Sequence, residues 1–247
     1  NKNLGSVLDK LTGTMVNLYD RAQKFCNSVG KKRVEPVVVM LTGEAGKGKS
    51  AMMYHLGANV LYHAGLLDGE MTDDEIEKKV SECIFARMIE NEYWDGYMGQ
   101  PCTLVDDFAQ LVDSTANPNL EFMEIIRAGN KFPYHLHMAG VDQKANAVFK
   151  SRALIATTNQ TNFSPVSISR KDAFLRRIDM GYKVDIAPQY QQQVQGSRNG
   201  MIAEEFRSGL KLEAFTFQKW NFENGQPLES TLYTFDQVAN ELRLLLT

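Results

Sequence analysis

Apolar positions recur along this chain with two different periods. In residues 6–28 they lie three or four positions apart, which predicts an amphipathic helix. A continuous β-branched run from Val37 to Leu41 is typical of a strand that is buried on both faces. We expect the helix to pack against another part of the protein; binding at a membrane surface is the alternative.

The next part of the chain alternates between helical and strand patterns. Helical spacing follows residue 51, and a second helical pattern opens with a capping box formed by Thr72 and Glu75. Four short apolar segments predict further strands: Cys83–Met88, 102–108, 153–159 and 180–186. Strands that alternate with helices indicate a parallel five-stranded sheet between helices, with ligands at the carboxyl ends of the strands.

The pattern changes after Pro188. A polar stretch gives way to aromatic alternation around an Asn-Gly turn, which predicts a small hairpin over residues 212–235. The last residues predict a short amphipathic helix that packs either on this hairpin or on an adjacent subunit. The expected domains are an N-terminal helical segment (1–30), a core (31–187) and a C-terminal subdomain (188–247).

Composition excludes several classes of protein. The 247 residues carry a formal charge of −3, and no apolar run reaches the roughly 18 residues of a membrane span, so we expect these residues to be soluble. Three scattered cysteines without a Cys/His cluster argue against a zinc site and favour a reducing, cytosolic compartment. The chain begins with Asn, and we expect it to be a piece of a longer product from which an anchoring segment is absent.

A phosphate-binding motif directly follows the first strand. The sequence GEAGKGKS matches the pattern GxxxxGK(S/T) between a buried strand and a helix, the context of a P-loop. Backbone N–H groups and the helix N-terminus would surround the phosphates, Lys49 would reach the β and γ oxygens, and Ser50 would ligate Mg²⁺. Lys47 is expected to face solvent or to add to the phosphate field. The predicted nucleotide-binding residues are Gly43, Glu44, Ala45, Gly46, Lys47, Gly48, Lys49, Ser50 and Ala51.

Polar residues end two later strands. Asp106 and Asp107 follow an apolar strand, as in a Walker B element, so Asp106 is expected to hold Mg²⁺ and Asp107 to orient or deprotonate the attacking water. Asn159 ends the next strand and is expected to bind the γ-phosphate or that water. Together with Lys49, these residues predict hydrolysis of ATP.

This ordered set of motifs resembles the superfamily 3 helicases, and in particular the 2C-type ATPases of picorna-like positive-strand RNA viruses. The matching pieces are GEAGKGKS, YWDGYMGQPCTLVDDF, GVDQKANAVFKSRALIATTN and SISRKDAFLRRIDM, which together span about residues 36–186. The resemblance implies an α/β P-loop NTPase core of AAA+-like fold, ATP and Mg²⁺ as cofactors, and hexameric rings. It also implies a role in viral RNA replication with other replication proteins, on cytoplasmic membranes of the host.

The resemblance implies a specific role for two neighbouring arginines. Arg176 and Arg177 match the family's arginine fingers, which would reach the γ-phosphate bound by a neighbouring subunit and stabilise the transition state. The alternative is a surface or interface pair that bridges to Asp172 and Asp179. The family's pore region falls just before Asn159 and suggests contacts to single-stranded RNA through Lys144, Lys150 and Arg152, although a solvated loop is the alternative.

Two departures from the family pattern and two rival functions remain. No cysteine follows Cys102, whereas some family members carry a C-terminal zinc element, and the segment from Ala64 to Glu92 is long; both features suggest a distant picorna-like group.

One rival function is a nucleotide-gated module that binds RNA, membranes or partners with slow hydrolysis. The other is a P-loop nucleotide kinase, which would need an acceptor site.

Overall fold

The structure is a computed structural model that describes residues 2–26, 32–88, 90–140, 147–192, 201–202 and 211–247. In chain order, the elements from the start of the chain to β4 are α1 (Lys2–Cys26), β1 (Val37–Thr42), α2 (Lys49–His63), α3 (Asp73–Cys83), β2 (Ile84–Arg87), β3 (Cys102–Val105), α4 (Glu121–Ala128) and β4 (Ala153–Thr158). The later elements are α6 (Asp172–Leu175), β5 (Met180–Ile186), β6 (Gln191–Gln192), β7 (Met201–Ile202), β8 (Phe215–Asn221), β9 (Gln226–Tyr233) and α7 (Phe235–Leu246), with short 3₁₀ turns at Pro188–Tyr190 and Leu212–Ala214.

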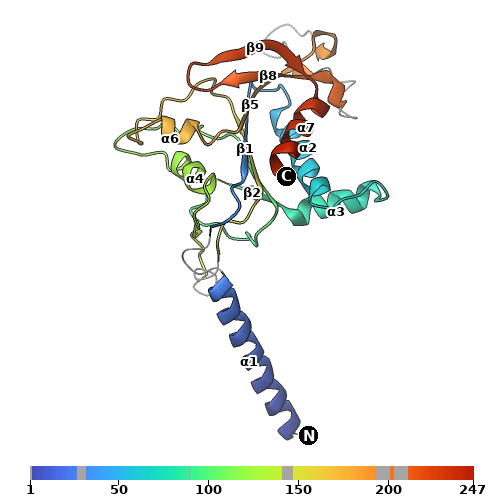
Figure 1. The fold of residues 1–247 in the computed structure, drawn as a ribbon, viewed down its shortest axis with the longest axis vertical. Helices are drawn as coiled ribbons and strands as arrows, with labels where there is room; N and C mark the ends of the chain where they lie inside the picture. Colours follow the sequence, from blue (N-terminus) through green and yellow to red (C-terminus); the bar gives the residue numbers. More distant parts are fainter. Residues whose placement is uncertain (1, 27–31, 89, 141–146, 193–200, 203–210) are drawn as a thin grey trace.

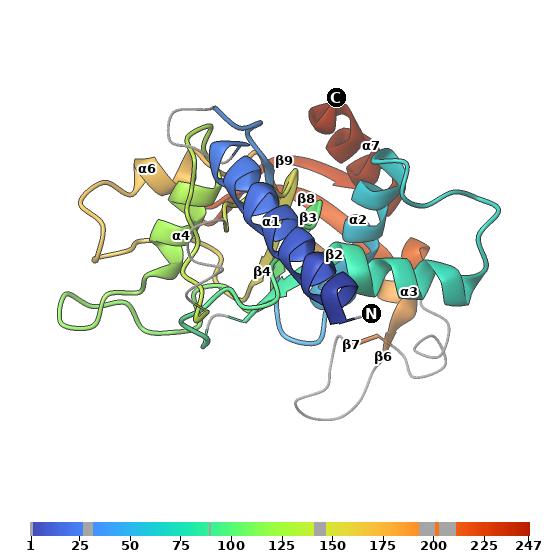
Figure 2. The same ribbon diagram turned by 90° about the horizontal axis from the view of Figure 1, so that it is seen from below.

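A mixed sheet forms the centre of the molecule. Among the described residues, seven strands pair in the order β2-β3-β4-β1-β5-β8-β9. The first five in this order are parallel, as predicted, and β1, β3 and β4 are buried along their whole length. Helices α2, α3 and α7 lie on one side of the sheet and α4 and α6 on the other (Figures 1 and 2). The α/β prediction is therefore confirmed.

Two hydrophobic cores fill the space between the sheet and these helices. The first lies under α2 and α7 and includes Leu56, Ile155 and Phe217. The second lies under α4 and α6 and is rich in aromatic rings, among which Phe108 and Phe174 stack 5.6 Å apart. Such packing rigidly fixes the strand ends from which the candidate site is built.

The C-terminal hairpin was predicted, but its pairing with the main sheet was not. Strand β8 pairs antiparallel with β5, and β9 pairs with β8, so residues 215–233 extend the main sheet. Helix α7 begins at a capping box formed by Thr234 and Gln237, and it buries Phe235, Val238 and Leu242 in the first core of its own chain. Within its own chain, α7 packs on α2 and on β8 of the hairpin.

The N-terminal helix also differs from expectation. Helix α1 extends away from the body of the molecule (Figure 1). Its apolar face does not pack against the described part of the chain, because the side chains of Val7, Leu11 and Met15 are 50–70% exposed. Across the described residues, no helix is both long enough and apolar enough to pass through a bilayer.

Candidate nucleotide-binding site

The predicted P-loop lies at the carboxyl end of β1 and leads into α2. Gly48 precedes the helix with a φ of 78°, and a Cβ atom there would lie 2.3 Å from a ring carbon of Phe215. Gly43 is equally confined, because its Cβ would lie 2.6 Å from the carbonyl oxygen of Val184. The loop is therefore built against β5 and β8, and only glycine fits at these two positions.

Lys49 points across the mouth of the loop toward β4. Its Nζ donates hydrogen bonds to the carbonyl oxygens of Gly43 (2.9 Å) and Glu44 (3.0 Å) and to Oδ1 of Asn159 (2.7 Å). Burial lowers the pKa of Lys49, and the carboxylates of Asp107 and Asp106 oppose that shift. The ammonium group thus has three polar partners that an incoming phosphate oxygen could replace.

Ser50 and Asp106 meet at the same edge of the sheet. The Ser50 hydroxyl donates to Oδ1 of Asp106 over 2.9 Å, and the Thr157 hydroxyl donates to the same oxygen. The Asp107 N–H donates to Oγ1 of Thr157 over 3.0 Å. Thr157 therefore connects the two acids to β4. This role was not predicted, although the two threonines just before Asn159 are a signal for it in the sequence.

Asp107 and Asn159 complete the cluster. Nδ2 of Asn159 lies 3.4 Å from Oδ1 of Asp107, while Oδ1 of Asn159 accepts from Lys49. Asp107 has a left-handed backbone with a φ of 53°, which is uncommon for a residue other than glycine. The structure thus brings together Lys49, Ser50, Asp106, Asp107 and Asn159, which come from the start of α2 and from the ends of β3 and β4.

Lys47 does not face solvent as expected. It is 8% exposed, and its Nζ forms an ion pair of 2.8 Å with Asp185 at the end of β5. Its aliphatic stem is buried under the loop, so the side chain fixes the P-loop to β5. Glu44, Ala45 and Gly46 at the tip of the loop are exposed, where they are open to a ligand.

Arg176 and Arg177 lie away from this cluster. They follow α6 and precede Asp179, whose N–H donates to the carbonyl oxygen of Val38 near the start of β1. The P-loop begins beyond the other end of β1, roughly 13 Å further along at about 3.3 Å per residue. Both arginines therefore lie near the opposite edge of the sheet from the P-loop of their own chain.

The ion pairs with Asp172 and Asp179, which were the alternative to the arginine-finger role, are not formed. Asp172 pairs instead with Arg170 over 3.0 Å. Within the part of the chain that the structure describes, Arg176 and Arg177 form no ion pair, and the buried Nε of Arg177 has no hydrogen-bond partner. The guanidinium group of Arg177 is thus left with an unused buried donor, while Arg176 is exposed.

The residues suggested for RNA contacts are only partly described. Lys144 lies outside the described residues. The side chain of Lys150 is exposed, as a nucleic-acid contact would require. Arg152 has a structural partner, since its Nη2 donates to the carbonyl oxygen of Leu246 over 2.8 Å, at the end of α7.

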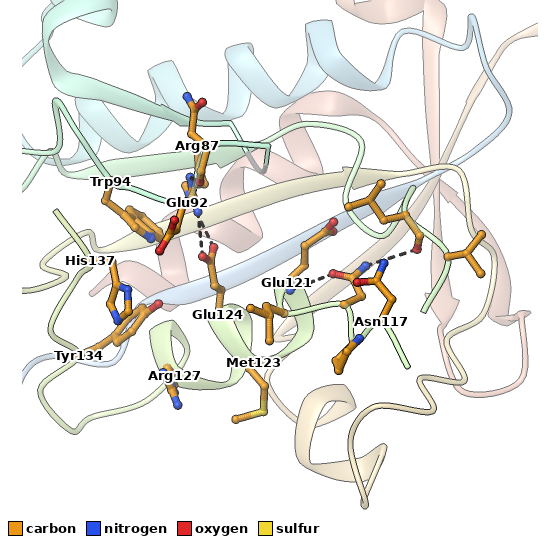
Figure 3. Close-up of a pocket in the computed structure, with 16 residues that line it drawn as sticks. Arg87, Glu92, Trp94, Asn117, Glu121, Met123, Glu124, Arg127, Tyr134 and His137 are labelled. Atoms are coloured by element: carbon orange, nitrogen blue, oxygen red, sulfur yellow. Dashed lines mark hydrogen bonds and ion pairs between the residues drawn. The ribbon is translucent and has the colours of Figure 1, made fainter. Parts of the chain in front are cut away.

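A cavity of about 430 Å³ lies beside α4, on the side of the sheet away from α2 (Figure 3). Trp94 and Tyr134 form part of its wall, and Arg87 binds Glu124 across it with an Nη2–Oε1 distance of 2.9 Å. Arg87 also lies over the ring of Trp94, 4.7 Å from the ring centroid. Glu121 lines the same cavity but belongs to a different network, which connects it to the acidic strand end.

Comparisons with known proteins show which family this chain resembles. Residues 39–160 match the family described as RNA helicase. The chain is 37% identical over 179 residues to the replicase polyprotein of acute bee paralysis virus, an alignment covering 72% of this chain and 9% of the relative. It is 34% identical over 215 residues to the replicase polyprotein of cricket paralysis virus, covering 84% and 12%.

A more distant relative extends the comparison. The chain is 30% identical over 188 residues to the genome polyprotein of human hepatitis A virus, covering 75% of this chain and 8% of that polyprotein. The chain spans about a tenth of the length of these curated relatives. It belongs to the superfamily 3 RNA helicases, the 2C-type family that picorna-like viruses carry in their replicase polyproteins.

Proposed function

We propose that this chain is the Mg²⁺-dependent ATPase of a viral RNA helicase that acts in genome replication. The observation that carries the proposal is the meeting of Lys49, the Ser50–Asp106 pair and the Asp107–Asn159 pair at one sheet edge. Each side chain is of the type that phosphoryl transfer to water requires. The family match to RNA helicases within replicase polyproteins supports the role in replication.

The residues divide the chemistry among them. The P-loop N–H groups and Lys49 bind the phosphates and balance the charge that develops on the γ-phosphoryl group. Asp107 accepts a hydrogen bond from, and orients, the attacking water. Asn159, which already contacts both Lys49 and Asp107, aligns this water with the γ-phosphate.

The oxygen atoms of Ser50 and Asp106 fit a magnesium ion. Their hydrogen bond of 2.9 Å places a hydroxyl and a carboxylate together, and Mg²⁺ favours one or two such ligands with substrate phosphates and waters. When bound, the ion would neutralise charge on the β and γ oxygens.

The site is completed by a second copy of the chain in this proposal. Arg176 and Arg177 are too far from their own P-loop to act there, Arg176 is exposed, and the buried Nε of Arg177 has no hydrogen-bond partner. A guanidinium group supplied by a neighbour would stabilise the transition state by roughly 10³–10⁵-fold. We therefore place these arginines at a subunit boundary of a hexameric ring that moves or remodels single-stranded RNA, with Lys150 among the backbone contacts.

The location of the whole protein follows the same proposal. It would act on cytoplasmic membranes of the host, alongside other replication proteins, through a segment outside this chain. The exposed apolar face of α1 is compatible with an attachment outside the described body of the molecule.

Phosphate release from ATP tests the proposal. The chain should release phosphate without an added acceptor, EDTA should stop the release, and Lys49→Ala should reduce it to background. Lys131→Ala is the matched control, because Lys131 is 61% exposed and pairs with Glu35 away from the site. Full activity in Lys49→Ala would reject the ATPase; transfer only to an added nucleotide would indicate a kinase.

A further inference from the structure

A buried carboxylate beside the acidic strand end has no role in the chemistry described above. Glu121, the first residue of α4, is 5% exposed. The nearby cation Arg87 is occupied by Glu124, and Glu121 forms no ion pair among the described residues. Burying such a group costs free energy unless hydrogen bonds compensate, so its contacts need an explanation.

The partner of Glu121 is the backbone of the loop that follows the acids. Oε2 of Glu121 accepts a short hydrogen bond from the N–H of Ala109. Ala109 is itself unusual, because its φ of 62° is left-handed and its side chain is buried. Its carbonyl oxygen accepts from Nε2 of Gln160 over 2.6 Å. Both backbone groups of Ala109 are therefore fixed by side chains.

The same loop carries the proposed water-orienting acid. Asp107 and Ala109 are the described non-glycine residues with positive φ, and they flank Phe108. Phe108 is fixed to β4 at both backbone groups: its N–H donates to the carbonyl oxygen of Thr157 (2.7 Å), and its own carbonyl accepts from Thr158 (2.9 Å). A left-handed alanine costs roughly 1–2 kcal/mol relative to its preferred backbone, so the contacts around the loop must hold it in place.

Glu121 is in turn held in position from outside the sheet. Its own N–H donates to Oδ1 of Asn119 over 3.0 Å, and Asn119 N–H donates to Asp113 over 2.8 Å. Figure 3 shows Glu121 at the start of α4, directed away from the Arg87–Glu124 pair. Glu121 thus holds the turn from the side of α4. The other contacts to the turn come from β4 and from Gln160, the residue after Asn159.

We infer that Glu121 is a positioning residue that holds Asp107 in its catalytic orientation by fixing the left-handed turn at Ala109. This inference rests on the proposed ATPase function. Without the carboxylate, the buried N–H of Ala109 loses its acceptor, and the turn relaxes toward a right-handed backbone. Asp107, two residues earlier, then moves relative to Asn159, while the P-loop contacts of the phosphates stay as they are.

Variants at Glu121 and Ala109 test this role through the split between turnover and binding. Glu121→Leu should lower kcat for phosphate release by roughly 10- to 100-fold, as small misplacements of catalytic groups do, and should leave the dissociation constant for ATP within about twofold. Glu121→Gln keeps an acceptor oxygen and should keep most of the activity. Adding Ala109→Gly to Glu121→Leu should restore part of kcat, because glycine adopts the left-handed backbone without strain.

Controls separate this role from general stability. Glu124→Gln removes a carboxylate from the same helix and should leave kcat within about twofold of the wild type. If Glu121→Leu does not fold, Gln160→Ala, which releases the carbonyl of Ala109 at an exposed side chain, should show the same loss of kcat without loss of binding. Wild-type kcat in Glu121→Leu, an equal loss in Glu121→Gln, or no recovery with Ala109→Gly would overturn the inference.

Failure of the proposed function gives a different result. If the wild type releases no phosphate under any condition, the ATPase proposal fails. Hydrogen exchange at the Ala109 amide then tests the remaining part: the amide should be protected in the wild type and in Glu121→Gln but not in Glu121→Leu. Equal exchange in all three proteins would show that Glu121 does not fix the turn at Ala109.

Discussion

Replacing Gly48 by alanine perturbs the P-loop at its contact with the C-terminal hairpin. The backbone there is left-handed, with a φ of 78°, which costs alanine roughly 1–2 kcal/mol. The new Cβ would also lie 2.3 Å and 2.8 Å from two ring carbons of Phe215, which is only 2% exposed and cannot move freely. Overpacking of this kind costs about 1–3 kcal/mol. We therefore expect the free energy of unfolding to fall by about 2–5 kcal/mol.

Gly65 offers a matched control for the backbone part of this cost. It has a φ of 69°, and a Cβ there would meet no atom within 4 Å. Gly65→Ala should therefore lose only about 1–2 kcal/mol. Equilibrium unfolding in urea, followed by the fluorescence of the buried Trp94 and Trp220, measures both variants.

A second substitution identifies the origin of the difference. Phe215→Leu alone should destabilise the protein by leaving a cavity, but in the Gly48→Ala background it should relieve the clash, so the two effects should not add. Gly48→Ala should also weaken ATP binding, because the clash displaces the turn that presents the phosphate-binding N–H groups. If Gly48→Ala costs no more than Gly65→Ala, the P-loop does not pack tightly on Phe215 of β8.

Three further predictions concern the site and its supports. Asp107→Asn should bind ATP normally but lose phosphate release, and loss of binding as well would make Asp107 a structural residue or a metal ligand. Asp185→Asn should lower the free energy of unfolding by about 0.5–1 kcal/mol, a modest value because its carboxylate is 46% exposed, and by much less in a Lys47→Met background; equal losses would show that the ion pair contributes nothing. Burial raises the pKa of Glu121 in the folded protein, so its ionisation destabilises the fold as pH rises through that folded pKa. Glu121→Gln should therefore gain stability relative to the wild type as pH rises above the ordinary glutamate pKa of about 4.3 toward the raised folded pKa, and a pH-independent difference in urea unfolding would contradict this.

The parts of the fold that depend on local pattern were predicted well. A buried β-branched run needs no distant partner to be recognised, so β1 and the P-loop context were clear from residues 37–50. The switch from α3 to β2 at Ile84 and the capping box at Thr72 were likewise local signals. The hairpin was predicted, but not its pairing with β5, because strand pairing depends on contacts that are remote in sequence.

The same distinction applies to the candidate site. The motifs identified Lys49, Asp106 and Asn159 because parallel strands bring their carboxyl ends to one edge. Some contacts that support them were missed: Lys47 was expected to face solvent or to add to the phosphate field, whereas it pairs with Asp185 of β5. Glu121 has no local signal at all, since an acid in the first turn of a helix is usually only a favourable charge for the helix dipole.

Phosphate release from an equal mixture of Lys49→Ala and Arg177→Ala shows whether two copies of the chain share one site. Each variant alone should be inactive, since one lacks the phosphate contact and the other lacks the arginine offered to a neighbour. In the mixture, an intact P-loop can meet an intact arginine across a subunit boundary, so activity should return, and wild-type activity per molecule should rise with protein concentration. A mixture that stays inactive, with wild-type activity independent of concentration, would contradict a site completed by a second subunit.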